Sequence, residues 1–226
     1  MIVIVKELLQ YDKDYIKYYI NIPKIYYKEN DNKDYVKNEM IESINQVIFE
    51  DITSFMNVVE DSHNISDVEH INVNCITEFQ VGYVSKNIMS LAIEFSQLAE
   101  LYDISYLKAY NYDFKLKKDI DLKDFFKENV DYIKILKKNI MIQAKTLFME
   151  FEGYAEYDLH HVCEDSICLD KENIFYFTRE YLILSFSSCE INEDILNLVE
   201  FKIPFSKIYH YLSEYAIKNI VKEIMI

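Results

Sequence analysis

Glycine, proline and arginine are scarce in this sequence, and tryptophan is absent. Two glycines, two prolines and one arginine occur among 226 residues. Two glycines cannot supply a phosphate-binding loop, a dinucleotide-binding fingerprint or the nucleophile elbow of hydrolases. No glycine- or proline-rich linker occurs either, so we expect one domain, or two small units packed closely together.

Long apolar runs are also missing. None reaches the roughly 18 to 20 residues of a membrane span. The apolar start Met1–Val5 is followed by Lys6 and Glu7, which end it too early for a signal peptide. We therefore expect a cytoplasmic protein, with the cell surface as the alternative location.

Positive charge is in deficit, with 24 basic against 39 acidic residues and a net charge of −15. Nucleic-acid binding and attraction to anionic membranes both depend largely on Lys and Arg, so neither is expected. Electrostatic steering instead favours a basic protein partner. The abundance of Lys, Ile, Asn and Tyr resembles the codon bias of an AT-rich genome.

Apolar residues are plentiful, at 50% of the chain, and regularly spaced. A chain of this length can bury about 70% of its unfolded surface, which is enough for a sizeable core. Pro23 places its strand at a sheet edge or at a break. Cys75 falls on an apolar strand face and is expected to be a buried small hydrophobe. Alternation with period two predicts strands at residues 2–9, 15–27 and 70–84.

A long amphipathic helix is predicted over residues 34–60 from apolar spacings of three and four. Its expected buried stripe includes Val47 and Ile48. A methionine-rich stripe of this kind can form a binding surface, but the spacing favours a place in the core.

The clearest pattern lies between Lys86 and Phe126. Apolar residues alternate over 89–95, and a second, tyrosine-rich strand follows over 106–114. Asp119 or Asp121 can cap a short helix after it. Two strands and a capped helix predict an α+β fold, with an antiparallel β-sheet packed against two or three amphipathic helices.

The C-terminal half continues with the same two kinds of element. We expect two halves, 1–84 and 85–226, that form one compact unit. The last helix would cover the sheet or, alternatively, offer a dimer face. The pattern predicts a helix over 130–148, a hairpin over 173–177 and 181–187, a strand over 199–203, and a helix from Pro204 to the C-terminus.

Three segments together resemble the RsiV-like domain family. They read AYNYDFKLKKDIDLKDFF over 109–126, NIFYFTREYLILSF over 173–186 and EFKIPFSKI over 200–208. The upstream strands and helix resemble the companion domain that often precedes this family, so the likeness spans about residues 15–208.

The resemblance implies a recognition module. Members of the family include the extracellular lysozyme-sensing part of an anti-sigma factor and the non-catalytic part of a peptidoglycan deacetylase. It therefore implies a protein partner, which could be basic and lysozyme-like. Glycine-bearing segments of the family are replaced by SQLAELYD at 96–103 and EINEDILNL at 190–198. We therefore carry over no binding residue.

The segment HHVCEDSIC, residues 160–168, allows three interpretations. His160 or His161 could bind zinc together with Cys163 and Cys168. The two cysteines could instead form a disulfide, which requires an oxidising compartment. The third interpretation, which we favour, is an acidic solvated loop with reduced thiols, so we predict no metal or other cofactor.

The sequence contains no recognisable catalytic motif. Four cysteines and five histidines are too many combinations for a Cys–His pair to be meaningful, and carboxylate pairs are unavoidable among 39 acids. We therefore expect a non-catalytic protein-binding or sensor module. The alternatives are a structural or self-assembling protein, and an enzyme that acts on cell-wall glycan.

Overall fold

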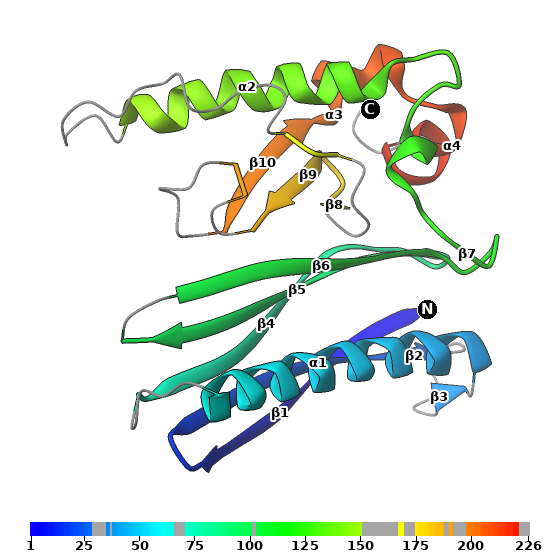
Figure 1. The fold of residues 1–226 in the computed structure, drawn as a ribbon. Helices are drawn as coiled ribbons and strands as arrows, with labels where there is room; N and C mark the ends of the chain where they lie inside the picture. Colours follow the sequence, from blue (N-terminus) through cyan, green and yellow to red (C-terminus); the bar gives the residue numbers. More distant parts are fainter. Residues whose placement is uncertain are drawn as a thin grey trace. The chain divides into compact units, whose positions relative to one another are not determined.

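The computed structural model of the chain describes residues 1–28, 35–36, 38–65, 71–100, 103–150, 167–169, 175–187, 190–191 and 198–221. The chain divides into two units, Met1–Asp119 and Ile120–Ile226 (Figure 1). The division expected from the sequence at 84/85 falls within the first unit, between two strands that are paired with each other. The units are therefore described separately.

The first unit is a sheet with one long helix, α1 (Glu39–Ile65). The strand order is β1-β2-β4-β5-β6-β7, and β3 pairs with β2. All neighbours are antiparallel except β2 and β4, which are parallel because the chain crosses over through α1. The α+β class is thereby confirmed. The strands are β1 (Ile2–Lys13), β2 (Ile16–Lys28), β3 (Tyr35–Val36), β4 (Val73–Val84), β5 (Ile88–Ala99), β6 (Asp103–Asp113) and β7 (Lys118–Asp119).

Helix α1 begins where Asn38 caps it. The Asn38 side-chain oxygen accepts hydrogen bonds from the backbone N–H groups of Met40 and Ile41, at 3.1 and 3.3 Å. The helix then packs against β2 and β4 (Figure 1). Its buried apolar residues recur at spacings of three, four and seven: Ile41, Ile48, Ile52, Phe55 and Val59.

Two sequence predictions about this helix need correction. The predicted start at residue 34 lies outside the described residues, Tyr35–Val36 form strand β3 and not helix, and the helix begins at Glu39. Val47, expected in the buried stripe, is 47% exposed, whereas its neighbour Ile48 is fully buried. Adjacent residues are 100° apart around a helix, so only one of the two can face the sheet.

The place of Pro23 in β2 follows from the hydrogen-bond pattern. Met1 and Lys28 exchange backbone hydrogen bonds, so residues of β2 with odd numbers direct their backbone groups away from β1. Pro23 is one of these, and the pairing of β2 with β4 has already ended at Ile20. The missing N–H of Pro23 therefore costs no ladder hydrogen bond, as the edge prediction requires.

Helix α1 closes the same edge two residues further along. The backbone N–H of Ile25 donates to the Asn45 side-chain oxygen at 2.9 Å. The Asn45 amide nitrogen donates to the Ile25 carbonyl at 2.8 Å. One side-chain amide thus takes the place of a strand residue and satisfies both backbone groups of Ile25.

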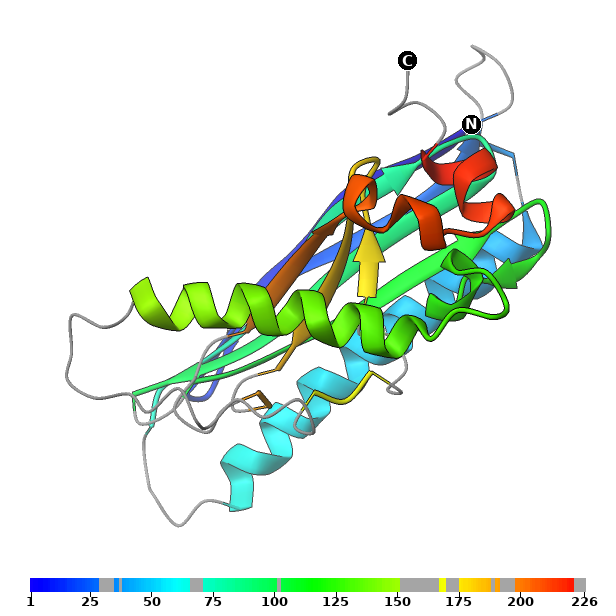
Figure 2. The same cartoon turned by 90° about the horizontal axis from the view of Figure 1, so that it is seen from above.

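The second unit holds a three-stranded antiparallel sheet with β9 in the centre. Its hairpin and last strand confirm the sequence prediction. Helix α2 (Tyr132–Glu150) packs against β10 (Figure 2). A short 3-10 helix, η1 (Leu122–Phe125), starts after Asp121, one of the two predicted caps. The strands are β8 (Phe175–Phe177), β9 (Tyr181–Phe186) and β10 (Val199–Pro204).

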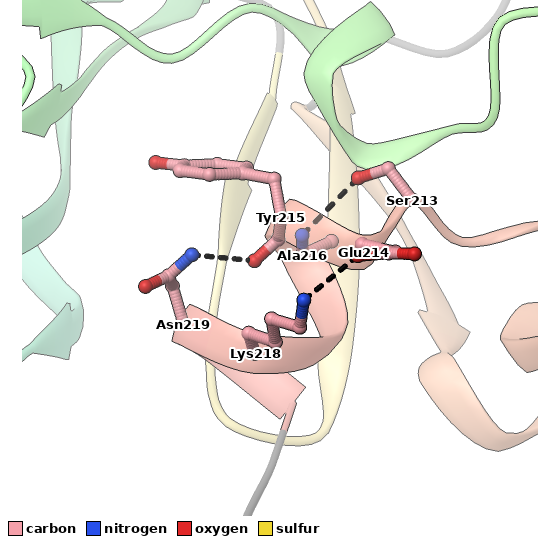
Figure 3. Close-up of polar contacts among 6 residues, drawn as sticks. All are labelled: Ser213, Glu214, Tyr215, Ala216, Lys218 and Asn219. Atoms are coloured by element: carbon pink, nitrogen blue, oxygen red, sulfur yellow. Dashed lines mark hydrogen bonds and ion pairs between the residues drawn. The ribbon is translucent and has the colours of Figure 1, made fainter.

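The C-terminal segment is a series of short turns rather than one helix, so the prediction of a continuous helix is wrong. Leu212 is extended and bridges to Phe126, and Ser213 then caps a new helix by accepting from Ala216 at 3.1 Å (Figure 3). Of the expected apolar positions, Ile208, Leu212, Ala216 and Ile220 are nonetheless buried, and Tyr215 is half-buried. The described turns are α3 (Phe205–Ile208), η4 (Tyr209–Tyr211), α4 (Glu214–Ala216) and the π-helical turn η5 (Ile217–Val221).

Candidate functional site

Most of the candidate metal ligands lie outside the residues that the structure describes. His160, His161 and Cys163 are outside the described residues. Cys168 is half-buried. Within the described parts of the chain, no group of three or more His, Cys, Asp and Glu side chains could hold a metal ion. The zinc, disulfide and solvated-loop interpretations of this segment remain predictions.

Cys75 on β4 is a buried thiol, as its place in the alternating pattern predicts. Its side chain is fully shielded from solvent. Burial, and secondarily the charge of Glu60, raise the pKa of this thiol to about 12. The thiol is therefore neutral at physiological pH and is not an activated nucleophile.

Two acidic residues on the inner side of α1 fasten the helix to the sheet. Asp51 accepts hydrogen bonds from the Lys108 ammonium at 2.5 Å and from the Tyr110 hydroxyl at 2.8 Å. Burial, followed by the hydrogen bond to Asp51, raises the pKa of Tyr110, so its hydroxyl stays protonated. Asp51 therefore has two donors on β6 that hold it in a structural contact.

Glu60 makes a similar contact nine residues, or about two and a half turns, later in α1. Its carboxylate accepts from the Lys13 ammonium at 2.6 Å and from the Tyr18 hydroxyl at 2.8 Å. The Lys13 hydrogen bond, and then that of Tyr18, lower the pKa of Glu60. Tyr18 is also stacked on Tyr11, with ring centroids 4.5 Å apart. These partners fix Glu60 as an anchor and not as a general base.

The outer side of α1 has a different character. Glu39, Glu50 and Asp61 are eleven residues apart, which is close to three helical turns, and all three are exposed. They therefore form one line of carboxylates along the solvent face. The sequence of α1 contains no Lys or Arg at any position. This face consequently carries negative charge that no residue of the same helix neutralises.

Large apolar side chains flank the acidic line. Val47 and Val58, again eleven residues apart, are 47% and 57% exposed on one side of it. Phe49 is 51% exposed on the other side. Single exposed apolar residues are ordinary, but here three of them border one acidic strip on a rigid helix. We call Glu39, Val47, Phe49, Glu50, Val58 and Asp61 the outer face of α1.

This face was not predicted from the sequence. Val47 was assigned to the core, and Phe49 and Val58 were not singled out. The eleven-residue recurrences of acids and of valines were the available signal. They show which side of the helix each residue shares, but only the packed sheet shows which side is exposed.

Among the described residues, no helix has both the length and the apolar character that crossing a bilayer requires. This agrees with the absence of a long apolar run in the sequence.

Comparisons with known proteins identify the fold. No protein-family model matches the sequence, and no curated protein matches it. Among solved structures, a DUF3298 family member from Bacteroides fragilis superposes with a TM-score of 0.54 at 15% identity, covering 98% of this chain and 97% of that one. A DUF3298 family protein from Pseudomonas aeruginosa gives 0.58 at 9% identity, covering 95% and 94%.

These likenesses extend over almost the whole of each chain. At such low identity they show a shared fold, and DUF3298 denotes a domain of unknown function. The fold therefore resembles that of DUF3298 proteins, while the activity has to be inferred from the residues of this chain.

Proposed function

We propose that this protein is a non-catalytic protein-binding module of the RsiV-like type, and that it takes a basic protein partner on the outer face of α1. The observation that carries the proposal is the combination of an acidic line with three flanking apolar side chains. Charged residues steer a partner and fix its orientation, while exposed apolar groups supply area that can be desolvated.

The helix is well suited to present such a face. Asp51 and Glu60 anchor its inner side to β6, β1 and β2 through hydrogen bonds of 2.5 to 2.8 Å. A partner therefore meets side chains on a preorganised backbone, which lowers the entropy lost on binding. The non-catalytic part of the proposal rests on the sequence, whose two glycines supply none of the common catalytic loops.

The partner chemistry follows from the charge. A protein with a cluster of Lys and Arg complements the carboxylate line, and a basic globular protein such as lysozyme is a suitable probe because the family resemblance implies that class of partner. Attraction between exposed charges weakens as salt is added, so the affinity should fall with ionic strength.

Binding can be measured by isothermal titration of lysozyme with the full chain. We expect the triple variant Glu39→Lys, Glu50→Lys and Asp61→Lys to bind at least about tenfold more weakly than the wild type. We expect Phe49→Ala to weaken binding by several-fold without changing the salt dependence. The loss of a buried aromatic contact acts mainly through the dissociation rate.

A matched control separates the site from net charge. Asp103, Glu128 and Glu180 are exposed acids elsewhere on the chain. Their joint replacement by Lys changes the net charge equally and should alter affinity less than threefold. Equal losses in both triple variants would contradict a specific site on α1, and lack of lysozyme binding by the wild type would contradict a lysozyme-like partner.

A further inference from the structure

Strand β1 forms an open edge of the large sheet. In the described part of the chain its strand partner is β2, and the opposite edge of β1 carries no strand (Figure 1). Three of its apolar side chains are exposed: Val5 at 38%, Leu8 at 63% and Leu9 at 40%. A twelve-residue edge strand with exposed apolar side chains is a template for pairing with another chain.

The hydrogen-bond pattern shows which residues of β1 could pair. Met1 and Lys28 exchange backbone hydrogen bonds, and the register of β1 with β2 continues to the turn without a bulge. Odd-numbered residues of β1 therefore face β2, and even-numbered residues direct their N–H and C=O groups to the open edge. Six residues present these groups in a row: Ile2, Ile4, Lys6, Leu8, Gln10 and Asp12.

The charge of β1 differs from that of the rest of the chain. The protein carries a net charge of −15, but β1 contains Lys6 and Lys13 against Glu7 and Asp12 and is neutral. Two copies that meet along this strand therefore bring no net charge of the strand together, despite the negative charge of the whole chain. Lysines often protect edge strands from pairing, but Lys13 is already paired with Glu60 of its own chain, and Lys6 can be matched by an acid of the same strand in another copy.

We propose that two copies of this chain pair antiparallel through β1, about a two-fold axis at Leu9, so that the two large sheets become one. In an antiparallel pair, two facing residues must both direct their backbone N–H and C=O groups toward the partner strand, or both direct them away from it. This restricts the allowed registers. With Leu9 on the axis, each Lys6 lies opposite Asp12 of the other copy. Glu7 lies diagonal to Lys13 of the other copy.

Other allowed registers are poorer. An axis at Lys6 or Glu7 puts like charges opposite each other, which destabilises a strand pair. An axis at Leu8 leaves Lys6 opposite Gln10. An axis at Gln10 shortens the overlap and sets the apolar Leu8 against Asp12. The Leu9 register gives nine paired residues in each copy, with the exposed Leu9 side chains against each other.

The association of the full chain can be followed by analytical ultracentrifugation over a concentration series. We expect a monomer–dimer equilibrium for the wild type. Lys6→Glu should weaken dimerisation at least about tenfold, because the symmetry turns two attractive pairs into two repulsive ones. Asp12→Lys should do the same, and the double variant should recover to within about threefold of the wild type.

Lys115→Glu, in the turn after β6, is the control and should dimerise like the wild type. Lys6, Asp12 and Lys115 are all exposed, and far-UV circular dichroism of each variant reports whether the fold is kept. A wild type that remains monomeric at every concentration overturns the proposal. So does a folded Lys6→Glu variant that dimerises normally, or a double variant no better than either single one.

A cross-link tests the register independently. Facing residues of a non-hydrogen-bonded antiparallel pair have Cα atoms about 4.5 Å apart, within the range for a disulfide. In a background with Cys163, Cys168 and Cys189 changed to Ser, Leu9→Cys should oxidise to a covalent dimer. Val5→Cys, opposite Lys13, should remain monomeric, and equal cross-linking of the two variants contradicts an axis at Leu9.

Discussion

Glu60 couples the stability of the first unit to pH. The hydrogen bonds from Lys13 and Tyr18 lower its pKa in the folded state. The stabilisation is therefore present above the pKa that Glu60 has in the unfolded chain, and it is lost as the pH falls through the lower, folded pKa. An unfolded glutamate titrates near about pH 4.3, so the loss should begin near that pH and continue below it.

The test is urea unfolding between neutral pH and pH 3 for the wild type and Glu60→Gln. The variant should have a lower midpoint at pH 7 and a shallower decline on acidification, so that the two curves converge at low pH. Glu50→Gln on the outer face of the same helix should follow the wild type. Parallel curves for Glu60→Gln and the wild type would show that this contact does not set the acid response.

At the scale of single residues, the sequence predicted burial better than it predicted partners. Cys75 is buried as alternation requires, because parity along a strand is a local property. The contact of Glu60 with Tyr18 joins residues 42 positions apart. It depends on where α1 lies on the sheet, and no pattern within either segment contains that information.

Asn45 makes a contact between two elements, because it completes the edge of β2 from α1. Asn45→Ala removes a donor and an acceptor together and leaves the N–H and C=O of the buried residue Ile25 without these partners. We expect a loss of about 2 to 3 kcal/mol in the free energy of unfolding. Gln46→Ala, one residue along on the exposed face, should cost less than about 0.5 kcal/mol.

Chemical denaturation at pH 7 measures both variants. Asn45→Asp is informative in addition, because its carboxylate can still accept from the Ile25 N–H but cannot donate to the Ile25 carbonyl. It should also be destabilised. A change below about 0.5 kcal/mol for Asn45→Ala would mean that water replaces the side chain at this edge without cost.

At the scale of elements, the longer strands and their order of appearance could be predicted, whereas the two-residue strands β3 and β7 and the pairing of all strands could not. The hairpin of β8 and β9 is local, and the sequence located it within two residues at each end. The parallel pairing of β2 with β4 requires the α1 crossover and is not local. The C-terminal segment shows the converse, because its apolar spacing is correct although Leu212 is extended. Ser213, the N-cap that marks the start of α4, was not recognised in the sequence.

At the scale of the whole molecule, the division at residue 119 makes a prediction about folding. Every described strand of the large sheet and all of α1 lie in residues 1–119. A fragment 1–119 should therefore fold alone, with a cooperative thermal transition seen by circular dichroism. Dispersed amide resonances in a two-dimensional NMR spectrum would confirm a fixed fold.

The fragment 1–84 is the matched control, because it ends at the division that the sequence suggested. It retains α1 but lacks β5, in which Leu91, Ala92 and Ile93 are all fully buried. Without that strand, β4 has an unpaired edge and the core loses one wall, so this fragment should be unfolded. A cooperative transition for 1–84 would support the division at 84/85. Loss of structure in both fragments would mean that residues 120–226 are required for the first unit to fold.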